Sequence, residues 1–147
     1  MTVVVTIGVL TFLGVTALAG GVALSVGLAA PPEQWLADVP VVDDWLVPGL
    51  VLGLGFGVGS LVTAFGVWRR PRWRLLAFVE RLTGHHWSLP ATIVIGAGQL
   101  TWILLEVIYL PALSALQVIY GCVGLALVVL PVLPPVRAHL NVRAPAA

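Results

Sequence analysis

The chain contains four long runs of apolar residues, and within each run the apolar side chains are continuous instead of alternating with polar ones. The runs cover residues 3 to about 29, about 46–68, 90–109 and 111 to about 130. A helix needs about 20 apolar residues to cross the roughly 30 Å hydrocarbon core of a bilayer. Because lipid admits only helices or closed barrels, and a barrel strand would alternate, the pattern predicts four transmembrane helices.

Only residues 109–112 separate the third run from the fourth. Proline fits the first turn of a helix, where its missing N–H is not needed, so we place Pro111 at the start of the fourth helix. A single helix kinked at Pro111 is the alternative, but it would contain about 40 apolar residues, twice what a bilayer holds. The pattern therefore favours an antiparallel hairpin.

A cleaved signal peptide is the rival interpretation of the first run. The run is about twice as long as the apolar core of a typical signal peptide, and no Lys or Arg precedes it. We therefore expect a retained transmembrane helix.

Composition excludes the soluble classes of protein. Hydrophobic residues make up 60% of the 147 residues and charged residues 9%, whereas soluble domains contain roughly a quarter charged residues. A formal net charge of +1 gives no basic surface for nucleic acid. The single cysteine, Cys122, excludes an intrachain disulfide and a multi-cysteine metal site. We expect one all-α integral membrane domain over residues 1–147, an antiparallel four-helix bundle.

The arginines determine the expected orientation. Five of the seven lie in the connection 69–89 and the other two, Arg137 and Arg143, follow the fourth run, whereas the charged residues of the connection 30–45 are all acidic. Since short arginine-rich loops stay in the cytoplasm, we expect both termini, the inner loop 69–89 and the tail 131–147 to be cytoplasmic and the outer loop 30–45 to lie outside. The lysine-free, Ala-, Gly- and Val-rich composition is typical of GC-rich bacteria, so we expect a multi-pass protein of the bacterial plasma membrane.

The inner loop has an amphipathic pattern. It mixes Leu75, Phe78 and Leu82 with arginines, so we expect it to lie along the cytoplasmic face with the arginines near anionic lipid headgroups. Tryptophans, which prefer the headgroup region, flank both sides of the predicted membrane: Trp35, Trp45, Trp68, Trp73 and Trp87. Plain anchoring and topology signals are the alternative role for both loops.

Small residues recur at helical spacing in the second run. One stripe consists of Gly49, Gly53 and Gly57, and a second stripe, on nearly the opposite side, of Gly55, Gly59 and Thr63, joined by Gly66. Helices in lipid associate through such close backbone contacts, so we expect the second helix to pack against two neighbours. The fourth run offers Gly121 and Gly124 for the same purpose. A monomer is the expectation, and a stripe left facing lipid would instead mark a homodimer seam.

One constellation of polar residues lies inside the predicted spans. Glu106 is the only charged residue in the four runs, and ionisable groups within a span are commonly functional. Gln99, Trp102 and Glu106 fall within an arc of about 80° on the third helix, and Gln117 and Tyr120 share a face of the fourth. Because the hairpin brings both faces to one depth, these five residues predict a binding site for a polar headgroup, a cation or a small ligand with an apolar body.

A structural role for the same residues remains open. No arginine lies in any run to pair with Glu106, so its carboxyl group would instead hydrogen-bond to Gln117, Tyr120 or Trp102 and lock the hairpin. Glu106 is also only about 6 Å of helix rise from the turn, close enough to reach the outer interface.

No cofactor, metal or catalytic site is predicted. His85 and His86 are adjacent at the edge of the inner loop, whereas haem held between helices needs histidines inside the spans. His139 lies in the tail, and Cys122 has the character of a small packing residue. No nucleophile is paired with a base, so we expect a non-catalytic protein.

Three segments carry a resemblance to a known group. Gln99-Leu-Thr-Trp102-Ile-Leu-Leu-Glu106, Leu116-Gln117-Val-Ile-Tyr120-Gly121 and Pro48-Gly49-Leu-Val-Leu-Gly53 together resemble a pattern in small four-helix membrane proteins of high-GC Gram-positive bacteria. The resemblance implies a four-helix architecture and no particular activity.

Two classes of function follow. The first is a non-catalytic membrane protein, either an accessory subunit of a larger membrane complex or a binder of a lipid or apolar small molecule between the third and fourth helices. The second is a small oligomeric transporter or channel in which Glu106 is the ion-coupling carboxylate. Expected partners are membrane lipids, a larger membrane complex or a second copy of the chain, and not nucleic acid.

Overall fold

The protein is described by a computed structural model over residues 1–28, 32, 44–109 and 114–142. Within those ranges the elements are α1 (Thr2–Ser25), α2 (Leu46–Leu50), η2 (Val51–Val58), α3 (Gly59–Arg69), η3 (Arg74–Leu76), α4 (Ala77–Thr83), α5 (Ser88–Tyr109), α6 (Ala115–Val129), η4 (Leu130–Val132) and α7 (Pro134–His139). Four helical segments in this part of the chain are long and apolar enough to cross a membrane: Thr2–Ser25, Leu46–Arg69, Ser88–Tyr109 and Ala115–Val132. The prediction of an all-α chain with four such segments is confirmed.

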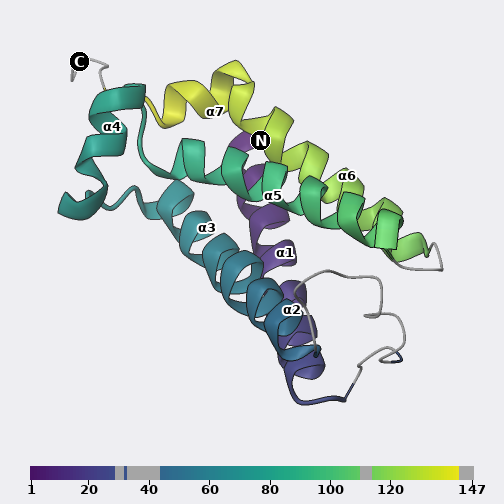
Figure 1. The fold of residues 1–147 in the computed structure, drawn as a ribbon. Coiled ribbons are helices and arrows are strands. Elements are labelled where there is room, and N and C mark those ends of the chain that lie inside the picture. The colour runs from purple at the N-terminus through teal and green to yellow at the C-terminus, as the bar shows by residue number, and fades with distance from the viewer. Residues whose placement is uncertain (29–31, 33–43, 110–113, 143–147) are drawn as a thin grey trace.

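The four segments form two helical hairpins (Figure 1). Helix α1 packs along α2, η2 and α3, and α5 packs along α6. The hairpins meet where α3 ends at Arg69 and α5 begins at Ser88, and they spread apart in the opposite direction. We call the first region the arginine end. The second, where α5 stops at Tyr109 and α6 begins at Ala115, is the hairpin end.

Glycines explain why α1 and the second segment lie so close together. A Cβ atom on Gly57 would stand 2.9 Å from the backbone of Leu18, and one on Gly49 would stand 2.9 Å from the carbonyl oxygen of Gly21. The predicted stripe of Gly49, Gly53 and Gly57 therefore faces α1, and a larger side chain there would push the two helices apart.

Among the described residues, the glycines of the second predicted stripe meet a second neighbour only at its far end, where a Cβ on Gly66 would stand 2.5 Å from the Trp87 ring and 3.0 Å from the side chain of Ser88. The expectation of two neighbours therefore holds at Gly66 and not along the whole stripe. Within the described chain, nothing lies within 4 Å of a Cβ placed on Gly55, and the nearest atom to one on Gly59 is 3.9 Å away. On α6, a Cβ on Gly124 would stand 3.1 Å from the carbonyl oxygen of Gly96, whereas one on Gly121 meets no described atom within 4 Å. The spacing of small residues predicts which of them share a face of a helix, but not which faces are in contact with another helix.

The second segment is not α-helical throughout. Val51–Val58 winds as a π-helix, and the N–H of Gly59 continues that pattern by bonding to the carbonyl of Leu54. The sequence predicts a plain α-helix over 46–68 instead. The glycines of η2 leave its backbone less restricted than residues with a Cβ atom would, and Phe56 of this element packs against Trp102 of α5, with ring centroids 6.1 Å apart.

Helix boundaries differ from the prediction at three places. Helix α1 ends at Ser25, before the predicted 29, because Gly27 takes a φ of 74° that no helix continues. Helix α5 begins at Ser88 instead of 90. Helix α6 begins at Ala115, with Ser114 as its N-cap. Pro111, and all of the outer loop 30–45 except residues 32, 44 and 45, lie outside the described residues.

The tail is structured, which the sequence did not predict. After η4 the chain forms α7, and Val136 and Leu140, four residues apart, are 0% and 1% exposed. The carbonyl of Leu140 accepts a hydrogen bond of 2.7 Å from the backbone N–H of His86. Residues 130–142 therefore dock onto α1 and onto the chain that leads into α5, and complete the core at the arginine end.

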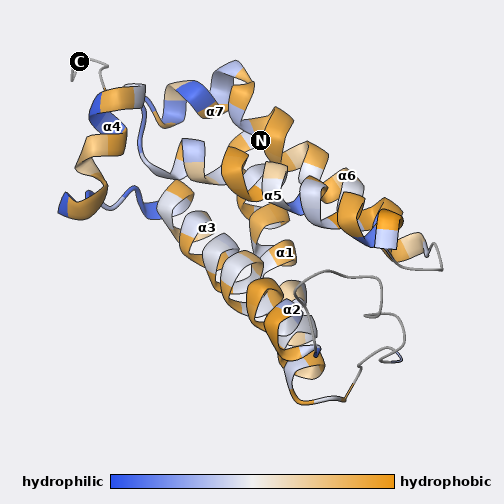
Figure 2. Ribbon diagram, viewed as in Figure 1, coloured by the Kyte–Doolittle hydropathy of each residue, from blue (hydrophilic) through white to orange (hydrophobic). Residues whose placement is uncertain are grey.

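The inner loop forms the expected amphipathic element. Leu75, Phe78 and Leu82 of η3 and α4 are 88%, 66% and 82% exposed and share one face at helical spacing. Figure 2 shows this apolar character on α4 beside hydrophilic positions, and shows that the outward faces of the long helices are mostly apolar. Such exposed apolar faces indicate surfaces that meet something other than water.

A candidate ligand pocket at the hairpin end

A pocket of about 430 Å³ lies at the hairpin end, between the two helical hairpins. All five predicted site residues line it: Gln99, Trp102, Glu106, Gln117 and Tyr120. Ile103, Ser114 and Leu116 of the α5–α6 hairpin also line it, and the facing wall comes from residues of α1 and η2 that the sequence did not assign to the site: Leu13, Thr16, Ala17, Gly20 and Leu52. The structure thus places the pocket between the hairpins, and not only between α5 and α6.

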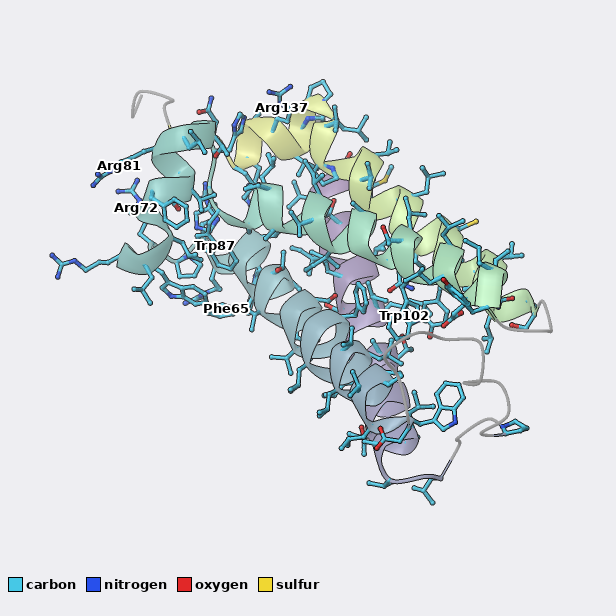
Figure 3. All side chains as sticks on the ribbon, viewed as in Figure 1. Phe65, Arg72, Arg81, Trp87, Trp102 and Arg137 are labelled. Atoms are coloured by element: carbon cyan, nitrogen blue, oxygen red, sulfur yellow. The ribbon has the colours of Figure 1, made fainter. Side chains whose placement is uncertain are left out.

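Helical spacing positions the polar residues. Gln99, Trp102 and Glu106 follow one another at intervals of three and four on α5, which keeps them on one face. Gln117 and Tyr120 lie three residues apart on the facing side of α6. Figure 3 shows the Trp102 side chain in the space between α5 and the α1–α3 hairpin.

Glu106 is held by Trp102. The indole Nε1–H of Trp102 donates a hydrogen bond of 2.5 Å to Oε1 of Glu106, one turn along the same helix. Of the three bonds considered for this carboxyl group from sequence, the structure shows this one. Phe56 packs edge-on against the same indole ring, so a residue of η2 also fixes the position of Trp102.

Gln117 has a structural task at the start of α6. Its Oε1 accepts a 2.7 Å hydrogen bond from the backbone N–H of Ser114, and together the two residues form a capping box. This arrangement satisfies backbone donors that the first turn of a helix leaves without partners. Gln117 therefore contributes to the pocket wall mainly by ordering the beginning of α6.

Gln99 is the unusual member of the site. Its side chain is 2% exposed, and its Oε1 has no hydrogen-bond partner among the residues that the structure describes. A buried acceptor without a partner costs about 1–3 kcal/mol. Gln99 is one of the residues that line the pocket, which makes its amide a candidate partner for the O–H or N–H group of a bound molecule.

The rest of the lining is mostly apolar. Leu13, Leu52, Ile103 and Leu116 contribute aliphatic side chains, and Tyr120 stacks on Phe12 of α1 with ring centroids 6.2 Å apart. Leu116 is 61% exposed, so the pocket extends to the outer surface of the protein. An apolar cavity with a few convergent polar groups is the usual form of a small-molecule site.

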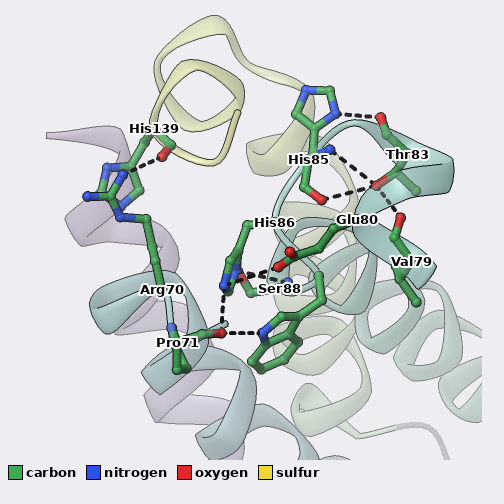
Figure 4. Close-up of polar contacts among 10 residues, drawn as sticks. Arg70, Pro71, Val79, Glu80, Thr83, His85, His86, Ser88 and His139 are labelled. Atoms are coloured by element: carbon green, nitrogen blue, oxygen red, sulfur yellow. Dashed lines mark hydrogen bonds and ion pairs between the residues drawn. The ribbon is translucent and has the colours of Figure 1, made fainter. Parts of the chain in front are cut away.

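The histidines lie at the other end of the molecule (Figure 4). His86 is 2% exposed, with Nδ1 2.8 Å from the Ser88 hydroxyl and Nε2 3.0 Å from the Pro71 carbonyl oxygen, which also accepts a bond from Trp87. Burial lowers the pKa of His86, against the opposing effects of the Pro71 carbonyl and Glu80. His85 instead contacts the carbonyl of Thr83. Within the described chain, no three His, Cys, Asp or Glu side chains are grouped to hold a metal ion.

No protein-family model matches this chain, and no curated protein or solved structure matches it either. Function is therefore inferred from the residues of the site, since a fold alone does not determine it.

Proposed function

We propose that this chain is a non-catalytic, multi-pass protein of the bacterial plasma membrane that binds a lipid or an apolar small molecule in the pocket at the hairpin end. The observation that carries the proposal is a largely apolar pocket whose lining residues include Gln99, a buried side chain with an Oε1 that has no partner among the described residues. Both termini and the arginine end would face the cytoplasm.

The four apolar segments and the position of the arginines support the membrane assignment. Outward-facing side chains such as Val94 and Val118 are 70% and 68% exposed, as expected of helices surrounded by lipid. Arg69, Arg70 and Arg137 all belong to the arginine end, so the positive-inside rule favours a cytoplasmic location for that end.

The pocket also favours a class of ligand. Leu13, Leu52 and Ile103 suit an aliphatic body, and Gln99 needs a hydrogen-bond donor. Glu106, already bonded to Trp102, adds a second acceptor oxygen at the same wall. The best match is therefore an apolar molecule with a hydroxyl or amide N–H at one end, such as an alkyl lipid with a small donor group.

A pair of probes tests this assignment. Binding of oleyl alcohol and of 1-octadecene, which has a similar aliphatic body but no donor, is measured by native mass spectrometry of the full-length protein in detergent. We expect the alcohol to bind about tenfold more tightly, since one hydrogen bond in a dry site is worth about 1.4 kcal/mol or more. The preference should disappear in Gln99→Leu.

Thr101→Val is the matched control. Thr101 lies on the exposed side of α5 and bonds to the carbonyl of Ala97, so its replacement leaves the pocket intact. Equal binding of both probes to the wild-type protein, or loss of the preference in the control as well, would contradict the proposal.

A small oligomeric transporter that couples ions through Glu106 is the second candidate. The observation in its favour is that Glu106, the only charged residue in the four apolar runs, faces the pocket. Proton flux into vesicles that is abolished in Glu106→Gln, together with a dimer in native mass spectra, would favour it. A monomer without flux would favour the binding protein.

A further inference from the structure

A second pocket, of about 300 Å³, lies at the arginine end. It is lined by residues from the end of α3 and the turn after it, from the segment before α5, and from the docked tail: Arg69, Arg70, Arg72, His86, His139, Leu140, Asn141 and Val142. It shares no residue with the pocket at the hairpin end. Its volume is at the lower end of the range typical of ligand sites.

The backbone at the end of α3 gathers the arginines. Arg70 is the C-cap of α3 and takes the left-handed conformation, with φ 50° and ψ 49°. Glycine or asparagine is usual there, because a side chain costs about 1–2 kcal/mol in this region. The chain turns sharply at Arg70, so that Arg69 and Arg72 line the same pocket from either side of the turn.

The docked tail closes the pocket from the other side. Nη1 of Arg70 donates a 3.2 Å hydrogen bond to the carbonyl oxygen of His139 (Figure 4). The His139 ring nitrogen Nε2 lies 3.1 Å from the carbonyl oxygen of Val67. These contacts join the end of α3 to the end of α7, residues about seventy positions apart in sequence. The guanidinium of Arg70 is thereby oriented at the pocket wall.

The pocket has a large excess of positive charge. It is lined by three guanidinium groups, and in the described part of the chain the carboxylate near it is Glu80, 3.6 Å from Nε2 of His86. Asp44 and Glu106, the other described carboxylates, belong to the hairpin end. Three like charges repel one another unless an anion joins them, and the planar fork of arginine matches the oxygens of phosphate.

We propose that the arginine-end pocket binds the phosphate group of an anionic ligand. The group can come from an anionic phospholipid headgroup or from a soluble phosphate compound. The apolar face of α4, with Leu75, Phe78 and Leu82 exposed, and the 63% exposed ring of Trp68 are suited to the headgroup region of a membrane. A lipid phosphate at that depth would reach the three arginines directly.

Full-length protein in mild detergent separates the two sources. In one arm, native mass spectrometry measures retained phospholipid after exposure to mixed micelles of phosphatidylglycerol and phosphatidylcholine. In the other arm, calorimetry measures binding of inorganic phosphate. We expect selective retention of phosphatidylglycerol if the phosphate comes from lipid, and saturable phosphate binding without lipid selectivity if it comes from a soluble compound. If the wild-type protein shows neither selective retention of phosphatidylglycerol nor saturable binding of phosphate, the proposal is overturned.

Variants test whether the pocket itself is responsible. Arg72→Gln should weaken the observed binding about tenfold, as expected for the loss of one charge-assisted contact. Arg74→Gln, which removes the same charge from the exposed η3 outside the pocket, should leave the binding unchanged. Equal losses in both variants would show general surface attraction and refute the proposal.

Arg70→Gly tests whether a loss of phosphate binding could arise from misfolding. Glycine accepts the left-handed conformation without strain, so this variant should keep the melting temperature of the parent protein while losing about tenfold in phosphate binding. If Arg70→Gly stays folded and binds as tightly as the parent protein, the proposal fails.

Discussion

The helices pack closely at the arginine end of the molecule and spread apart at the hairpin end. At the arginine end, Gly66 lies so close to Trp87 that a Cβ on it would stand 2.5 Å from the indole ring, and the buried Val67, Val136 and Leu140 fill the core. At the hairpin end, Phe56 and Trp102 meet through large rings, the hairpins spread, and a pocket of about 430 Å³ remains. Side-chain size therefore decides whether a helix pair closes or leaves space for a ligand.

The difference extends to polar groups. At the arginine end the Pro71 carbonyl accepts a bond from Trp87 and lies 3.0 Å from Nε2 of His86. At the hairpin end Gln99 buries an oxygen without a partner among the described residues. A satisfied polar group stabilises one arrangement, whereas an unsatisfied acceptor such as Gln99 Oε1 is stabilised further by a donor, so the pocket at the hairpin end suits a ligand that donates a hydrogen bond.

Shortening a buried side chain of the docked tail should reduce the stability of the protein more than the other substitutions below. Leu140→Ala is expected to lower the free energy of unfolding by about 2–5 kcal/mol, because Leu140 is 1% exposed and its removal leaves a cavity. Leu133→Ala, at a position 37% exposed in the same tail, should cost much less. Thermal unfolding in detergent measures both. Equal losses would mean that the tail does not close the arginine end.

Bulk between α1 and η2 should have the next largest effect. Gly57→Leu is expected to destabilise the protein by about 1–3 kcal/mol, because even a Cβ would stand 2.9 Å from the backbone of Leu18. Gly55→Leu, two residues away, should be close to neutral, since nothing described lies within 4 Å of a Cβ there. Similar melting temperatures for the two variants would show that the hairpins are not packed in this way.

Substitution of Glu106 probes the hairpin end. Glu106→Leu should cost about 0.5–2 kcal/mol, because the Trp102 indole N–H loses its acceptor in an apolar setting. Glu106→Gln keeps an acceptor oxygen and should keep the melting temperature. If both variants unfold like the parent protein and bind oleyl alcohol equally well, the bond to Trp102 holds nothing in place and Glu106 is not part of the site.

Acid should reduce the stability of the protein through His86 at the arginine end, and this effect should be the smallest of the four. The pKa of His86 is lowered mainly by burial, and the neighbouring charged groups are Glu80, Arg70 and Arg72. A lowered pKa means that the folded state binds the proton less readily than the unfolded state, so stability is constant above the reference value of 6.5 and falls as the pH drops below it. Melting temperatures between pH 5 and 8 measure this fall, which should disappear in His86→Gln but persist in His85→Gln.

The sequence was sufficient to predict residues that share a face. Intervals of three and four on α5 placed Gln99, Trp102 and Glu106 together, and the structure has all three on one pocket wall. This works because helical periodicity is fixed by local backbone geometry. The same logic predicted the glycine stripe that faces α1.

Distances between helices were not predictable in this way. Periodicity places Gly55 on a face but does not say whether another helix covers that face. The second stripe was expected to pack along its length, whereas among the described residues only Gly66, at its end, is in close contact with Trp87. The contribution of Leu13 and Leu52 to the pocket depends on the angle between the hairpins, which arises from packing over the whole molecule.

Local deviations were also missed. The π-helix η2 has no pattern of its own in the sequence beyond its glycines, and the tail, with three prolines between 131 and 135, gave no periodic signal long enough to predict a docked helix. In the tail, the spacing of Val136 and Leu140 is the signal that was available.

The docked tail has a consequence for the order in which the protein is made. Residues 134–142 leave the ribosome after all four long apolar segments, and chains are synthesised at about 5–20 residues per second. Both hairpins can therefore assemble before His86 and Arg70 form their hydrogen bonds to the carbonyl groups of Leu140 and His139. The arginine-end pocket therefore forms last. A chain that stops short of α7 would keep its apolar helices but would lack that pocket.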